Sequence, residues 1–259
     1  MKLPIFQVDA FTDHVFGGNP AAVCPLDNWL DDKTMQQLAL ENNLSETAFF
    51  VSTENGYGLR WFTPEIEVDL CGHATLATAH VLFEHLDYKE PEIHFHTKSG
   101  ELIVSKEGDR LMMNFPSDEM VKVEPPEVLF QALGIRSDFV FKSDDYMVVL
   151  DSEEEVQNLD PDFNILSEVN ARGIIVTAPG DQVDFVSRFF APGVGIDEDP
   201  VTGSAHTKLT PYWSKRLGKD ILEARQISKR VGNLTCRFRD DRTEILGKAV
   251  TYMIGEVTI

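Results

Sequence analysis

Two stretches of the chain share one pattern: RWFTPEIEVDLCGHATLATAH, residues 60–80, and RFFAPGVGIDEDPVTGSAH, residues 188–206. Each begins with an arginine, two aromatic residues, a small residue and a proline, and each then runs through an acidic segment to a glycine and a helix-like segment. Pairing the arginines, the glycines at 72 and 203, and those at 100 and 232 gives offsets of 128, 131 and 132 residues. A weaker match joins residues 42–51 to 169–178. Four matches in register predict an internal duplication.

The composition limits the class of partner. The 259 residues are 42% hydrophobic, which is enough for a packed core, and the formal net charge is −20. A chain this acidic repels phosphate backbones and anionic membrane surfaces. We therefore expect neither nucleic acid nor a membrane as a partner. A small anionic substrate requires a local site that overrides the overall field.

The cysteines and the hydropathy indicate a compartment. Cys24, Cys71 and Cys236 are odd in number and widely spaced, which argues against a disulfide framework and against a zinc site. The first residues contain no long apolar run typical of a leader, and no window reaches 18 uninterrupted apolar residues. We therefore expect a soluble, cytoplasmic protein.

The periodicity predicts an α+β fold. Two similar lobes are expected, each a curved, mostly antiparallel, barrel-like sheet wrapped round one buried helix, with these helices at residues 72–86 and 203–217. Pro211 should kink or divide the second helix. The polar, proline-rich segment 116–127 marks the lobe boundary. We expect lobes of residues 1–117 and 118–247, with 248–259 as a candidate closing strand of the first lobe and the active site in the cleft between the lobes.

The starts of the two buried helices are candidate anion sites. A helix N-terminus presents unpaired backbone N–H groups and a partial positive charge. His73 follows Gly72, and Ser204 follows Gly203. Taken singly, each glycine or serine is better explained as a helix cap. Their matched positions in a duplication favour a carboxylate-binding site.

Five motifs occur in order along essentially the whole chain: Phe16–Val23, Asn43–Phe49, Gly72–Thr75, Met113–Pro116 and Glu198–Ala205. Together they resemble the motifs of the PhzF-type phenazine-biosynthesis isomerases. That family is similar in fold to diaminopimelate epimerase and proline racemase, which implies two barrel-like lobes.

The resemblance implies roles for particular residues. Glu46 would be the acid/base group that moves a proton on a small cyclic or unsaturated amino-carboxylate, and His73, Asp199 and Ser204 would hold the carboxylate and assist the proton shift. It also implies a homodimer. No metal is expected, and no organic cofactor, since no phosphate loop or dinucleotide fingerprint is present. The residues expected to line the substrate are Asn19, Gly72, Ala74, Thr202 and Gly203.

The chemistry of Glu46 agrees with this role. A carbon acid needs a partly desolvated base, and Glu46 directly precedes an apolar strand. Its counterpart in the duplication is Gly173, so only one lobe carries the acid. The related epimerases use two facing cysteines. Cys71 stands at the place of the first, whereas Pro200 falls at the place of the second. One acid acting on one face gives isomerisation rather than inversion.

Two other functions remain open from the sequence. An amino-acid racemase or epimerase is disfavoured by the missing second thiol. A non-catalytic binder of small carboxylates would keep the same residues but exchange no C–H proton. Arg60 and Arg188 fit an anion site or a structural pair equally well, and His206 ranks below His73 as a site residue. The sequence does not identify the substrate.

Overall fold

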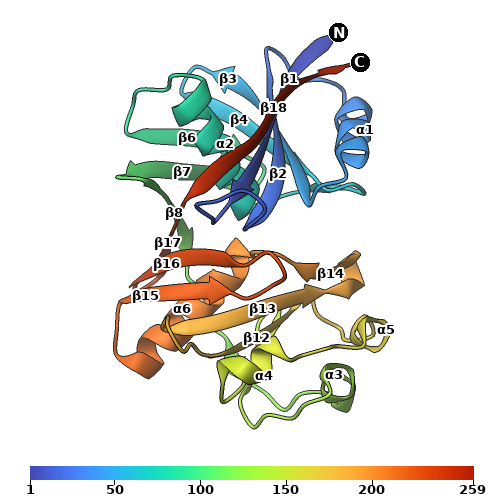
Figure 1. Cartoon of the computed structure of the whole chain (residues 1–259), viewed down its shortest axis with the longest axis vertical. Helices are drawn as coiled ribbons and strands as arrows, with labels where there is room; N and C mark the ends of the chain where they lie inside the picture. The colour runs from blue at the N-terminus through green and yellow to red at the C-terminus, as the bar shows by residue number, and fades with distance from the viewer. The chain divides into compact units, whose positions relative to one another are not determined.

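The computed structural model describes all 259 residues, which form two compact units (Figure 1). The first unit contains residues 1–114 and 244–259, and the second contains residues 115–243. The helices and strands that begin in the first unit are β1 (Lys2–Ala10), β2 (Asn19–Leu26), α1 (Asp32–Asn42), β3 (Glu46–Thr53), β4 (Gly56–Phe62), β5 (Glu67–Val68), α2 (Gly72–His85), β6 (Glu92–Thr97), β7 (Gly100–Glu107), β8 (Arg110–Pro116) and β18 (Ala249–Thr258).

The sheet of the first unit has the order β18–β1–β2–β3–β4–β6–β7–β8. Only the β2–β3 and β4–β6 pairs are parallel, and β5 adds to β4. The last strand of the chain pairs with the first along its whole length, from Lys2 opposite Thr258 to Ala10 opposite Ala249. In Figure 1 the red β18 runs beside the blue β1.

Helix α2 is buried on nearly all sides. Nine of its residues are buried, from His73 to Leu82, because GHATLATAHVL consists mostly of small and apolar residues that let strands approach from several directions. The helix contacts β1, β2, β3 and β18. On the other side of the sheet, α1 packs through Met35, Leu38 and Ala39.

The second unit repeats this plan. The elements that begin in it are β9 (Val121–Lys122), α3 (Glu127–Leu133), β10 (Val140–Lys142), β11 (Tyr146–Val149), α4 (Glu153–Gln157), α5 (Phe163–Leu166), β12 (Ile174–Pro179), β13 (Phe185–Ala191), the 3₁₀ turn η1 (Pro192–Val194), β14 (Ile196–Asp199), α6 (Gly203–Leu217), β15 (Ile221–Gln226), β16 (Gly232–Arg239) and β17 (Arg242–Gly247). Most of β17, from Glu244 on, belongs to the first unit. The sheet of the second unit has the order β9–β10–β11–β12–β13–β15–β16, and the β11–β12 and β13–β15 pairs are parallel.

The predicted duplication and fold class are confirmed. The parallel pair β2–β3 corresponds to β11–β12, the pair β4–β6 corresponds to β13–β15, and the buried helix α2 corresponds to α6. The short α4 and α5 stand where the first unit has α1. The acidic run 151–162, which reads as a solvated face, contains α4, because three glutamates in a first helical turn favour a helix start.

The matched arginines form matched ion pairs. Arg60 donates from Nε and Nη2 to the two carboxylate oxygens of Glu67 at 2.7 and 2.8 Å, and Arg188 donates in the same way to Glu198 at 2.7 and 3.0 Å. Arg188 also donates to the backbone oxygen of Leu159 at 2.7 Å. Each guanidinium is therefore used to fix its own hairpin, which favours the structural interpretation of this arginine pair.

Pro211 does not divide α6, so that part of the expectation is wrong. The helix runs unbroken from Gly203 to Leu217. A proline removes the N–H that would bond to the carbonyl four residues earlier, here Thr207. The backbone N–H of Asp118 donates to that Thr207 oxygen at 3.1 Å and replaces the missing donor.

None of the helices combines the length and the apolar character that a membrane-spanning helix requires.

Candidate active site

The first-unit candidates meet where three elements begin. Asn19 is the first residue of β2, Glu46 the first of β3, and His73 the second of α2. Glu46 lies opposite Ala21 in the parallel β2–β3 pair, so both strand starts are at one end of the sheet. Gly18 has a φ of 59°, and a Cβ there would lie 2.0 Å from the Ala10 oxygen, so only glycine permits the tight turn into Asn19.

Glu46 and His73 form a buried acid/base pair. Oε2 of Glu46 lies 2.9 Å from Nε2 of His73, and the two side chains are 12% and 6% exposed. At this distance the two groups interact as an ion pair, and neither atom has another hydrogen-bond partner. A buried polar pair without further partners calls for an explanation, and a catalytic role is one of those known. Both atoms keep the capacity to exchange a proton with a ligand.

The surroundings of His73 determine where its proton lies. Asn19 Nδ2 is 3.2 Å from Nδ1 of His73, so in the neutral ring the proton is on Nε2, next to Glu46. A second ring proton requires the Asn19 amide to turn its oxygen toward Nδ1. Burial lowers the pKa of His73, but the interactions with Cys71 and with Glu46 outweigh burial and leave that pKa well above its usual value.

Cys71 lies in the same cluster as a neutral thiol. Its Sγ is 3.5 Å from Nδ1 of His73. Burial, assisted by the negative charge of Glu46, raises the pKa of Cys71 to about 11. Because the thiolate is the nucleophile, Cys71 is poorly suited to attack or to proton abstraction at neutral pH. This agrees with the interpretation of Cys71 as a small buried residue.

The cluster also offers a set of metal ligands. One ligand atom each from Glu46, Cys71 and His73 lie within 4.8 Å of one another, and zinc accepts carboxylate, thiolate and imidazole. A metal would have to displace protons from the thiol and from the imidazole, whose pKa values are both raised. Because the thiol of Cys71 and the imidazole of His73 both hold their protons strongly, the cluster is better suited to acid/base chemistry than to metal binding.

The second-unit candidates lie at the start of α6. Asp199 ends β14, and its Oδ2 accepts a hydrogen bond from Thr202 Oγ1 at 2.5 Å. The buried Gln226, at the end of β15, accepts from the Thr202 backbone N–H at 2.8 Å and donates to the Asp199 backbone oxygen at 2.8 Å. This one amide fixes the loop that leads into Gly203 and Ser204. Gln226 was not predicted from the sequence.

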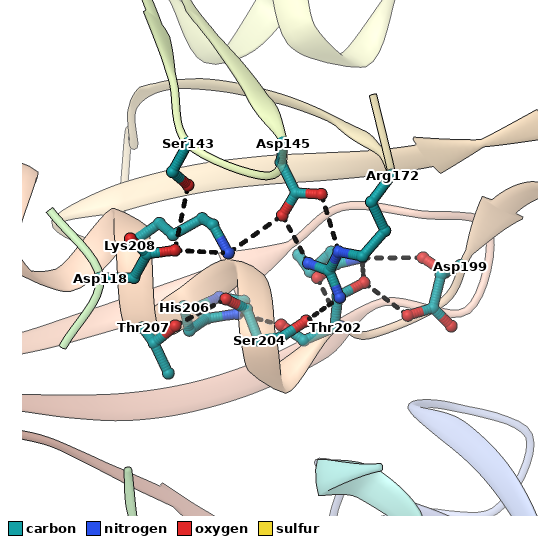
Figure 2. Close-up of polar contacts among 11 residues, drawn as sticks. Asp118, Ser143, Asp145, Arg172, Asp199, Thr202, Ser204, His206, Thr207 and Lys208 are labelled. Atoms are coloured by element: carbon teal, nitrogen blue, oxygen red, sulfur yellow. Dashed lines mark hydrogen bonds and ion pairs between the residues drawn. The ribbon is translucent and has the colours of Figure 1, made fainter. Parts of the chain in front are cut away.

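Ser204 has an arginine as its neighbour. Arg172 Nη1 donates to Ser204 Oγ at 3.0 Å, while the same guanidinium pairs with Asp145 (Figure 2). Arg172 and Asp145 were also missed, because 27 and 32 residues separate Arg172 from Asp145 and from Ser204. No local motif joins them. The only sequence signal is that Arg172 precedes Gly173, the counterpart of Glu46.

The two buried helices start without a capping side chain, unlike most of the surface helices. Asp31, Ser152 and Asp162 cap α1, α4 and α5 with their side chains. The residues before α2 and α6, Cys71 and Thr202, make no such bond. Their first-turn N–H groups and the positive ends of the helix dipoles are thus left for another acceptor. Gly72 and Ala74 lie in the first turn of α2, and Gly203 in that of α6.

The asymmetry between the halves has a steric cause. A Cβ on Gly173 would lie 2.2 Å from the ring atom Cζ of Phe189. The position that corresponds to Glu46 therefore has no room for a side chain. His206 also differs from His73: it is fully buried, its Nδ1 lies 2.8 Å from the Thr202 oxygen, and burial lowers its pKa to about 4. His206 is a neutral, structural residue at physiological pH.

Comparisons with known proteins agree with this fold. The model of the phenazine biosynthesis-like protein family matches residues 8–255. An uncharacterised isomerase of Pseudomonas aeruginosa is 56% identical over 255 residues, 98% of each chain. The crystal structure of a PhzF-family phenazine biosynthesis protein of Enterococcus faecalis has a TM-score of 0.98 at 47% identity and covers 100% of both chains. A probable proline racemase of Agrobacterium radiobacter shares the fold, with a TM-score of 0.66 at 10% identity over 99% of this chain and 93% of that one.

The fold is thus that of the PhzF proteins and of a probable proline racemase, and bacterial relatives about half identical to this chain are named isomerases. The chain belongs to the phenazine biosynthesis-like (PhzF) family.

Proposed function

We propose that the chain is an isomerase that moves a proton between carbons of a small cyclic or unsaturated amino-carboxylate, with Glu46 as the acid/base group and with neither metal nor organic cofactor. The observation that carries the proposal is the Glu46–His73 pair: two buried atoms that lie 2.9 Å apart and have no other hydrogen-bond partner. A carboxylate held beside a histidine with a raised pKa can accept a proton and return it.

The proton shift balances within the substrate and Glu46. The C–H bond breaks as its proton moves to a Glu46 carboxylate oxygen, and the electron pair moves into the conjugated system of the substrate. Glu46, whose acidic proton can exchange with water, then delivers a proton to another carbon to form the new C–H bond, so the carboxylate is regenerated. The protonated His73, beside Glu46, stabilises its negative charge before and after the shift.

Ser204 and the uncapped start of α6 are proposed to hold the substrate carboxylate, with Asp199 and Thr202 fixing the loop that precedes them. The resemblance to the family supports these roles, as do the first-turn N–H groups of α6 and the Arg172 guanidinium next to Ser204. Such a local positive site is needed because the chain carries a net charge of −20.

Deuterium incorporation tests the proposal. The protein is incubated in deuterated water with a panel of cyclic and unsaturated amino-carboxylates, a dihydro-hydroxyanthranilate among them, and carbon-bound deuterium is followed by NMR. Wild type should incorporate deuterium and Glu46→Gln should lose at least about a hundredfold in rate, the usual contribution of a general base. Glu41→Gln, an exposed glutamate on α1, is the matched control and should exchange like wild type.

Other outcomes select other functions. Binding without exchange in any variant would indicate a non-catalytic carboxylate binder. Equal exchange by wild type and Glu46→Gln would remove Glu46 as the proton carrier and direct attention to Cys71, the one thiol of the cluster.

A further inference from the structure

Arg172 is held rigidly by a buried carboxylate. Its Nε donates to Asp145 Oδ1 at 2.9 Å, and its Nη2 donates to Oδ2 of the same carboxylate. Asp145 is completely buried. The bidentate geometry fixes the plane of the guanidinium, because both hydrogen bonds must be made at once. The Arg172 side chain is nonetheless 43% exposed, so this fixed side chain is partly open to solvent.

A buried lysine supplies a second cation to the same carboxylate. Nζ of Lys208, on α6, lies 3.2 Å from Asp145 Oδ2 and 3.0 Å from Asp118 Oδ2, and this side chain is only 5% exposed. Ser143 Oγ donates to Asp118 at 3.0 Å and holds that carboxylate in place (Figure 2). Two cations thus face two carboxylates, and this network holds Arg172 with its Nη1 directed at Ser204.

The contact between Arg172 and Ser204 has only one possible direction. A guanidinium has donors and no acceptor. Ser204 Oγ therefore accepts from Nη1 at 3.0 Å, and the Ser204 hydroxyl hydrogen must point to another acceptor. A hydroxyl that accepts from a charged donor becomes a stronger donor itself. A free serine hydroxyl can donate or accept a hydrogen bond. Because the Ser204 hydroxyl already accepts from Arg172, it is left to act as a donor in the first turn of α6.

We propose that Arg172 is a positioning residue that makes Ser204 the hydrogen-bond donor to an anionic oxygen of the substrate, so that the site prefers a carboxylate to its uncharged amide. This inference rests on the proposed function, in which Ser204 holds the substrate carboxylate. It adds that the preference for anions depends on Arg172, and that Arg172 acts through Ser204.

Paired probes and a double-mutant cycle test the inference. Dissociation constants are measured by NMR titration for anthranilate and for its uncharged amide, 2-aminobenzamide. Wild type should bind anthranilate about tenfold or more tightly than the amide, the usual effect of a hydrogen bond to a charged group. Arg172→Gln should lose this preference. In a Ser204→Ala background, Arg172→Gln should change the preference no further.

Three variants separate positioning from other effects. Arg172→Lys keeps the charge but lacks the fork that bonds Asp145 and Ser204 together, so it should behave like Arg172→Gln. Arg136→Gln, an exposed arginine of the same unit, should behave like wild type. Ser204→Ala keeps the ion pairs of Asp145 with Arg172 and Lys208. It therefore tests the preference for anthranilate over 2-aminobenzamide without disturbing these buried charges. Circular dichroism at the assay temperature checks that each variant is folded.

Several outcomes would overturn the inference. Equal wild-type affinity for anthranilate and its amide would show that the site has no preference for anions. A loss from Arg172→Gln that is as large in the Ser204→Ala background as in wild type would show that Arg172 does not act through the serine. Glu46→Gln separates the two proposals, because it should lose deuterium exchange and keep the preference for anthranilate. If wild type prefers anthranilate to its amide but incorporates no deuterium into any substrate, the proposed reaction is wrong while the role of Arg172 stands.

Discussion

Glu46 and Gly173 occupy matched places in two copies of one fold, and their different surroundings explain the different residues. In the first unit the strand start opens toward His73, and a carboxylate fits beside it. In the second unit the Phe189 ring fills the corresponding space. The adjacent Arg172 reaches Ser204 instead. One copy thus carries a carboxylate beside a histidine and the other a guanidinium beside a serine, as expected when a duplicated scaffold is specialised for a function.

The titration of His73 tests the proposed pair directly. In wild type its pKa should lie well above 6.5, whereas His206, which is buried without a carboxylate, should titrate near 4. Glu46→Gln should lower the pKa of His73, because it removes the carboxylate charge that stabilises the imidazolium and leaves the effect of burial, which lowers that pKa. The raised folded-state pKa contributes stability that is complete below about 6.5 and is lost as pH rises through the folded value. Two-dimensional NMR of labelled imidazoles measures these shifts. A His73 pKa unchanged by Glu46→Gln would disprove the coupling.

The sequence predicts residues that lie in contiguous motifs and misses those joined by the fold. Glu46, His73, Asp199 and Ser204 stand in short signatures whose spacing is visible in one line of sequence. Arg172 is 32 residues from Ser204 in the chain, and Gln226 is 24 residues from Thr202. Both reach the start of α6 only because the fold brings the ends of other strands beside it. Neither has a local motif, so their positions follow from the sheet order alone.

At the scale of helices and strands, the sequence predicted the two central helices almost to the residue. Their apolar character and their glycine starts are local signals, and α6 has the predicted bounds, Gly203–Leu217. The predicted division of α6 at Pro211 was wrong. The backbone N–H of Asp118, 93 residues before the proline, donates to the Thr207 carbonyl that the proline leaves free. The short helix α4 was missed, since three consecutive glutamates read equally well as a solvated loop.

The hairpin arginines provide a test at the same scale. Arg188→Gln leaves the mostly buried Glu198 carboxylate without its cation and frees the Leu159 oxygen, so it should lower the free energy of unfolding by about 3 kcal/mol. Binding of anthranilate should not change. Urea denaturation and NMR titration measure the two quantities. The Arg188→Gln/Glu198→Gln double variant should cost less than the sum of the single variants. A weaker affinity with unchanged stability would instead assign Arg188 to anion binding.

At the scale of the whole chain, the local cations resolve an apparent contradiction. A net charge of −20 disfavours anionic ligands at long range, but salt screens such fields within about 8–10 Å. A fixed guanidinium and an uncapped helix start act at hydrogen-bond distance, where they dominate. An acidic surface with a small cationic site would select small carboxylates and reject polyanions.

The path of the chain predicts that its last strand stabilises one unit selectively. β18 pairs with all of β1 in the first unit, and Thr251 Oγ1 lies 2.9 and 2.7 Å from the Nε2 atoms of His80 and His85. Ending the chain at Lys248 should therefore lower the unfolding midpoint of the first unit and leave that of the second unchanged. Buried tryptophans report each unit, Trp61 in the first and Trp213 in the second, so single-tryptophan variants followed by fluorescence in urea separate them. The full-length single-tryptophan variants are the controls. An equal loss of both midpoints would show that the two units unfold as one.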